Sequence, residues 1–122
     1  MYAIIAQILS VFIMFENLQS RVRLKDFEIK AIQKLFAKYF LISDHIWLFG
    51  SRANLTKHGG DIDLYIETTL PSLQAFDKKL KLYGDLCDRI GEQKIDIVIN
   101  TINQPDNLVI YQVARNEGVQ LG

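Results

Sequence analysis

The stretch that decides the fold runs from His45 to Glu67 and has the sequence HIWLFGSRANLTKHGGDIDLYIE. Its first five residues are mostly aromatic or β-branched and stop at Gly50, which predicts a short buried strand over His45–Phe49. Its last seven residues, Asp61–Glu67, alternate between polar and apolar, which is the period of a second strand. The stretch is therefore expected to form two strands joined by a turn and a loop.

Acidic side chains share one face of this second strand. Asp61 and Asp63 are two residues apart, so they point the same way at roughly 7 Å spacing along the backbone. A third strand is predicted over Lys94–Asn100 (KIDIVIN), with Asp96 opposite its isoleucines. If the two strands are neighbours, three carboxylates converge and repel one another. Divalent cations remove that repulsion, and carboxylate and phosphate oxygens are the ligands that Mg²⁺ prefers, so these acids predict a metal site.

The turn before the acids has the composition of a phosphate-binding turn. Gly50 lets the backbone approach a phosphate, and the Ser51 hydroxyl with the amides of a following short helix can donate to it. Arg52, Lys57 and His58 are candidates to offset the negative charge of a triphosphate. The alternatives are that Ser51 only caps the helix and that the three cations belong to a solvated loop.

Periodicity predicts the remaining elements. An amphipathic helix is expected over Leu24–Phe40, and a last helix after Pro105 that stops at Gly118. A helix with Ser72 as its N-cap is expected to end near Gly91. The apolar residues of this middle helix that fall on one stripe are Leu73, Phe76, Leu80, Tyr83, Cys87 and Ile90. The economical architecture is α/β (α+β), a small mixed sheet of three or more strands flanked by helices.

Bulk composition bounds the function. The chain has 122 residues, enough for a single domain over 1–122, and its net charge of zero gives no field that would attract nucleic acid or an anionic membrane. Its one cysteine, Cys87, excludes an internal disulfide and is assigned to the core. Packing is the expected role of Trp47, and His45 is expected to cap or flank its strand.

The apolar segment Met1–Phe15 leaves three interpretations open. It lacks the basic residues that precede the apolar run of a secretory signal, and it is shorter than the ~20 residues that cross a bilayer. It is a helix packed on the core or on a partner, an upstream extension of a chain that starts at Met14, or a membrane anchor. The working expectation is a cytoplasmic protein without a membrane span.

The ordered set of motifs resembles the minimal nucleotidyltransferases of the polymerase-β-like superfamily. Those proteins have a Gly-Ser turn, a spacer of about ten residues, Asp-x-Asp on the next strand and a third acid on a later strand. The resemblance covers roughly 45–100, and the segment Ala114–Val119 is similar to the family's C-terminal helix. By resemblance, Gly50 and Ser51, with Arg52 beside them, would bind the nucleotide. The three aspartates would be catalytic and bind metal.

The resemblance implies an enzyme that uses two Mg²⁺ ions and ATP to place AMP on an acceptor and release pyrophosphate. Many single-domain members are antitoxins that silence a partner HEPN-domain ribonuclease toxin by attaching adenylate to one of its tyrosines. The same arrangement is expected here, with a homo- or hetero-oligomer and without direct nucleic-acid binding.

The chain departs from the family pattern in two places. Nine residues separate Ser51 from Asp61, one fewer than expected, and Gly60 stands where a serine is usual. Two consequences are possible. Gly59 and Gly60 allow unusual backbone dihedrals with which the shorter loop can still close, or the shorter loop weakens the activity. Two alternatives therefore stay open: an antitoxin that acts by occlusion with a vestigial site, and a transferase acting on a small molecule such as an aminoglycoside.

Overall fold

The computed structural model describes residue 18 and residues 21–57, 59–91, 93–103 and 108–122. Their helices and strands are, in chain order, α2 (Asp26–Tyr39), β1 (His45–Phe49), the 3-10 helix η1 (Gly50–Ala53), β2 (Ile62–Thr68), α3 (Ser72–Ile90), β3 (Ile95–Thr101), α4 (Val109–Glu117) and β4 (Val119–Gln120).

The strands form one mixed sheet in the order β3-β2-β1-β4. β1 pairs antiparallel with β2 and with β4, and β2 pairs parallel with β3. α3 makes the long crossover that a parallel pair requires. The structure thus confirms the predicted mixed α/β sheet, and it adds β4, a two-residue strand too short to show a period in the sequence.

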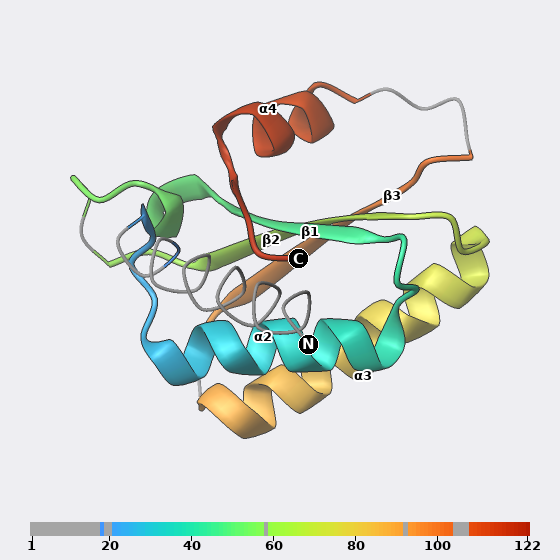
Figure 1. The fold of residues 1–122 in the computed structure, drawn as a ribbon, viewed down its shortest axis with the longest axis horizontal. Coiled ribbons are helices and arrows are strands. Elements are labelled where there is room, and N and C mark those ends of the chain that lie inside the picture. Colours follow the sequence, from blue (N-terminus) through green and yellow to red (C-terminus); the bar gives the residue numbers. More distant parts are fainter. Residues whose placement is uncertain (1–17, 19–20, 58, 92, 104–107) are drawn as a thin grey trace, which may run out of the picture.

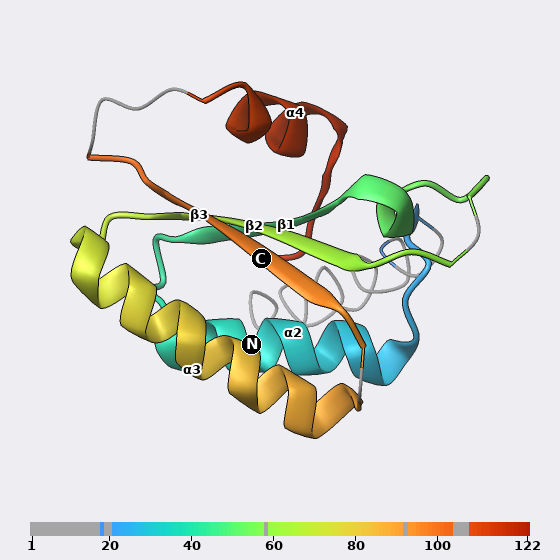
Figure 2. The same ribbon diagram turned by 180° about the vertical axis from the view of Figure 1, so that it is seen from behind.

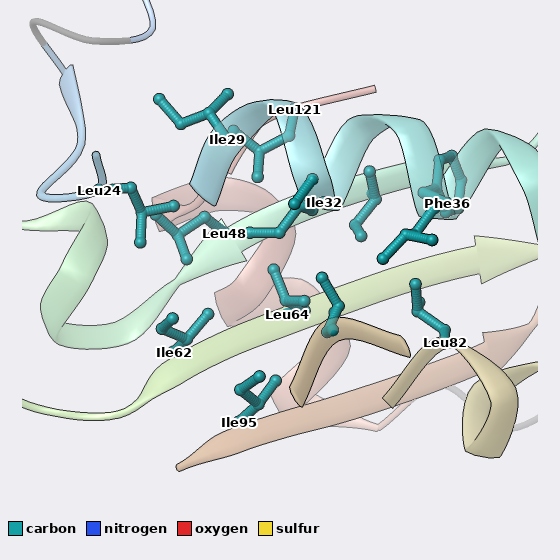
Figure 3. Packing of buried hydrophobic residues seen from close by; sticks show 14 of the residues in the cluster. Leu24, Ile29, Ile32, Phe36, Leu48, Ile62, Leu64, Leu82, Ile95 and Leu121 are labelled. Carbon is teal, nitrogen blue, oxygen red and sulfur yellow. The ribbon is translucent and has the colours of Figure 1, made fainter. Parts of the chain in front are cut away.

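The sheet has one fully covered face and one partly covered face. α2 and α3 pack against the first face, and α4 lies over the second (Figures 1 and 2). The even-numbered residues Ile62, Leu64 and Ile66 of β2 lie in the core on the side of α2 and α3, which contribute Ile32 and Leu82 among other apolar side chains (Figure 3). The odd-numbered residues therefore point to the α4 side, where the predicted carboxylates lie.

The predicted face of α2 is largely correct. Among its expected apolar positions, Ala31, Ile32, Leu35 and Phe36 are buried, but Phe27 is 51% exposed. The helix begins two residues later than predicted, at Asp26.

The prediction of which apolar side chains of α3 are buried is wrong for four of the six residues. The side chains buried against the sheet are Ala75, Leu82, Leu86 and Ile90. The exposed ones are Leu73, Phe76, Leu80 and Tyr83, with exposed fractions between 43% and 87%. The helix carries two apolar stripes, and only one of them faces the sheet. Ser72 is the first helical residue and Pro71 is the N-cap, so the predicted cap is also one residue out.

Aromatic packing holds α4 over the second face of the sheet. Trp47, Tyr65 and Ala114 are buried together, and the rings of Trp47 and Tyr65 lie 5.3 Å apart. Tyr65 also stacks on Tyr111 of α4 at 5.7 Å. The packing role of Trp47 is confirmed, and α4 ends before Gly118 as predicted.

A buried carboxylate fastens the start of β1 to the end of β2. Asp44 accepts hydrogen bonds from the Thr68 hydroxyl at 2.7 Å and from the backbone amides of Leu41 and Thr69 at 2.9 and 3.2 Å. These three donors satisfy a charge that would otherwise be costly to bury.

The remaining expectations fall partly outside the described residues. Cys87 is half-buried against the core, and His45 is the exposed first residue of β1. The segment Met1–Phe15 and His58 lie outside the described residues. In the part of the chain that is described, no helix is long and apolar enough to cross a membrane.

Candidate active site

The sheet brings two of the predicted carboxylates face to face. Asp63 on β2 and Asp96 on β3 are direct partners in the parallel pair, so their side chains leave the same face of the sheet side by side. Asp61 stands just before β2, two residues from Asp63. The sequence prediction required the two strands to be neighbours, and β2 and β3 are neighbours.

The pKa of Asp63 reflects its position among these acids. Burial raises the pKa of its carboxyl above the ordinary value, and the charges of Asp96 and Asp61 raise it further, while Lys94 acts in the opposite direction. Burial and both neighbouring carboxylates thus disfavour the charged form of Asp63.

Lys94 is an internal counter-ion of the acids. Its Nζ lies 3.3 Å from Oδ2 of Asp61, and this contact, followed by the charges of Asp61 and Asp96, raises the pKa of the lysine. Lys94 stands two residues before Asp96, so strand parity places both on one side. Sequence reasoning missed this residue, although that spacing carried the signal.

The donor chemistry fits a divalent cation, but the acids do not form a ready-made ligand set. Among the residues that the structure describes, no group of three or more His, Cys, Asp or Glu side chains is arranged to hold a metal ion. Asp61 pairs instead with Lys94. Burial, followed by the charges of Asp96 and Asp61, nevertheless raises the pKa of Asp63, and a bound cation would relieve the repulsive part of that shift.

Gly50 allows the turn to approach the acids. Its φ of +71° lies in the left-handed region, and a β-carbon at this position would stand 2.3 Å from Oδ2 of Asp63. Only glycine accommodates both constraints. The predicted turn therefore lies directly against the predicted carboxylate.

Ser51 is the second residue of η1, and the structure explains the glycine at position 60. A β-carbon at Gly60 would lie 2.0 Å from Oγ of Ser51, and the φ of Gly60 is +91°. A serine at position 60, as is usual in the family, would therefore collide with Ser51 here. The close approach to Ser51 and the positive φ both explain why a glycine stands at position 60.

Arg23 holds the loop between the turn and the acids. Its guanidinium donates to the carbonyl oxygens of Ser51, Asn54 and Gly59 at 2.9, 3.1 and 2.7 Å. Sequence reasoning missed this residue because nothing local marks an arginine that binds carbonyls 28 to 36 positions away.

Arg52 is engaged in the same scaffold. It donates to the carbonyl oxygens of Gly60 at 3.2 Å and Arg23 at 3.0 Å, and to Oε1 of Gln93 at 3.4 Å. Gln93 donates in turn to the buried Glu28 of α2 at 2.6 Å. These contacts give Arg52 a structural role in the loop, and its predicted contact with nucleotide stays a prediction.

Two grooves open beside the site. One has a volume of 730 Å³ and is lined by Gly50 together with the cations Arg21 and Lys57. The other, of 640 Å³, is lined by Asp63 and Asp96 together with apolar side chains of α3 and α4. The turn and the acids are thus both accessible to a ligand, and Lys57 lies where it can meet one.

Comparison with known proteins agrees with this geometry. The family model described as polymerase beta, nucleotidyltransferase, matches residues 30–121, which is most of the chain. A comparison with curated proteins finds no match. Because the match spans α2 to β4 and includes the turn and all three aspartates, the chain belongs to the polymerase β nucleotidyltransferase family.

Proposed function

We propose that this nucleotidyltransferase moves AMP from ATP to a hydroxyl group of a partner protein. The observation that carries the proposal is the pairing of Asp63 with Asp96 across neighbouring parallel strands, against the Gly50 turn. In the reaction, the acceptor oxygen forms a bond to the α-phosphorus and the bond from that phosphorus to the bridging oxygen breaks. Pyrophosphate leaves with the electron pair.

Each residue of the candidate site has a separate role in the proposed reaction. Asp96 is exposed on the edge strand, where it can take the proton of the acceptor hydroxyl. Asp61, Asp63 and Asp96 would hold two Mg²⁺ ions, which would screen the phosphate charge. Ser51 and the amides of η1 would donate to the terminal phosphates, and Lys57 lines the groove that begins at Gly50.

The acceptor in this proposal is a tyrosine of a HEPN-domain ribonuclease toxin, and the protein is its cytoplasmic antitoxin. The described part of the chain is taken up by the sheet and its three covering helices, so a surface that binds an acceptor must lie on this domain or come from a partner. The resemblance to single-domain antitoxins of this superfamily favours a protein acceptor.

Label transfer tests the proposal. The wild-type chain, ATP labelled at the α-phosphate, Mg²⁺ and the purified product of the adjacent gene are incubated together. Label is expected on a tyrosine of that product. The matched control is Asp61→Asn/Asp63→Asn, which keeps the size of the side chains and should transfer nothing. Equal labelling by both proteins, or none by the wild type, would refute the catalytic claim.

A second candidate, neutralisation of the partner by occlusion alone, is favoured by one contact. The ion pair between Lys94 and Asp61 occupies a carboxylate that a metal would need. The affinity for Mg²⁺–ATP separates the two candidates, because a protein that acts only by occlusion has no need to bind it. Calorimetry with wild type and Asp61→Asn/Asp63→Asn measures that affinity directly.

A further inference from the structure

The apolar stripe that α3 leaves exposed leads away from the candidate site. We define the α3 stripe as Leu73, Phe76, Leu80 and Tyr83, which recur at three- and four-residue steps along one side of the helix. From Leu73 to Tyr83 the helix rises roughly 15 Å. An apolar row of this length on the surface, next to a reaction site, is typical of an interaction surface.

The α3 stripe is continuous with the groove that holds the acids. Leu80 and Tyr83 belong to the stripe and also line the 640 Å³ groove together with Asp63 and Asp96. The charge of Asp96 contributes, after contacts with Cys87 and burial, to the raised pKa of Tyr83. A molecule seated on the stripe therefore has one end beside the carboxylates.

α4 supplies the opposite wall of this surface. Ile110 lines the same groove, and its neighbours Val109 and Val113 are exposed. Figure 2 views the sheet from the side of β3, the edge strand, with α3 on one side of it and α4 on the other. The two helices present apolar side chains on both sides of the edge strand that carries Asp96.

Charge narrows the kind of partner. Lys79 lines the same groove as Leu80 of the stripe and the two acids. An acidic side chain near the hydroxyl of the acceptor would pair with Lys79. Without that lysine, the same side chain would be repelled by Asp63 and Asp96.

We propose that the α3 stripe and Ile110 are the docking surface for the acceptor protein, which lays an amphipathic helix along α3. That helix places three or four apolar anchors on the stripe and carries the acceptor hydroxyl at the end that reaches Asp96, with an acidic residue beside it. This inference rests on the proposed function for the identity of the acceptor. The inference adds the surface of this chain that binds and selects the acceptor.

The test compares two apolar-to-acidic changes in a chain that already carries Asp61→Asn/Asp63→Asn, so that binding is measured without transfer. Phe76→Asp/Leu80→Asp is expected to weaken binding of the purified product of the adjacent gene at least about 100-fold. Ile42→Asp, at a fully exposed side chain in the turn after α2, is the matched control and should bind as the parent does. Leu73→Asp repeats the test at a side chain that is 87% exposed, where folding is not at risk.

Each outcome decides the docking surface separately from the chemistry. Binding unchanged by the α3 substitutions, or no binding of that product by the parent chain, overturns the docking surface. A dimer of this chain that Phe76→Asp/Leu80→Asp splits in sedimentation also overturns it, since a second copy then covers the stripe. Binding that the α3 substitutions abolish, in a protein whose wild type transfers no label, supports the docking surface and refutes the proposed function alone.

Discussion

Gly50 brings the backbone of the turn so close to β2 that the carboxylate of Asp63 leaves no room for a β-carbon. At the scale of single residues, this contact couples the Gly50 turn to the acids. A side chain at position 50 would have to move one or the other. The geometry of the site is therefore set by the absence of one methyl group.

Gly50→Ala is expected to destabilise the fold and to abolish transfer. Gly59→Ala is the matched control, since Gly59 also has a positive φ (+62°) but a β-carbon there meets nothing within 4 Å. The control should lose about 1 kcal/mol from backbone strain alone. Urea unfolding and label transfer measure both proteins. Equal losses in the two variants would show that contact with Asp63 is unimportant.

The protonation of Asp63 gives a pH dependence with a defined sign. Burial, Asp96 and Asp61 raise the pKa of this carboxyl in the folded state above its ordinary value of 3.8. The folded protein then binds more protons than the unfolded chain between these two pKa values, so the charged carboxylate lowers stability as pH rises through that window.

Asp63→Asn is accordingly expected to be more stable than the wild type at pH 7, with the difference shrinking as pH falls through that window toward 3.8. Urea unfolding across this pH range measures it. Saturating Mg²⁺ should stabilise the wild type more than the variant, because the cation relieves the same repulsion. A variant less stable than the wild type at pH 7 would contradict the assigned repulsion.

At the scale of elements, the loop between η1 and β2 depends on an arginine outside it. Arg23→Met keeps the length of the aliphatic stem and removes the three bonds to the carbonyls of Ser51, Asn54 and Gly59. We expect a loss of about 2 kcal/mol in unfolding free energy and faster amide exchange in 50–60. Lys34→Met, on the exposed side of α2, is the control and should change neither.

The helices and strands differ in how far the sequence determines their orientation. The face of Asp61, Asp63 and Asp96 could be predicted because side chains alternate strictly along a strand. The buried face of α3 could not, because the helix has two apolar stripes and the crossover between β2 and β3 decides which one meets the sheet. Arg23 was beyond prediction because its partners are backbone carbonyls, which have no signature in the sequence.

At the scale of the whole molecule, Asp44 ties together segments that are 24 residues apart. Asp44→Ala would leave the Thr68 hydroxyl and two amides without their acceptor, and we expect a loss of about 3 kcal/mol. Asp44→Asn is the control, since its amide oxygen still accepts a hydrogen bond and should retain part of the stability. Thermal unfolding of the two variants measures the difference. A loss in Asp44→Ala no larger than that in Asp44→Asn would contradict this role.

The alternation along β2, with Ile62, Leu64 and Ile66 in the core and Asp63 and Tyr65 on the α4 side, has a consequence for how such a protein can evolve. A deletion within the strand would exchange the two sets and destroy folding and chemistry at once. A deletion in the loop before Asp61 leaves both sets in place. This loop is where the chain is one residue shorter than the family pattern. Insertions and deletions should therefore accumulate between Asn54 and Gly60 across descendants of this sequence, while the length of Ile62–Thr68 stays constant.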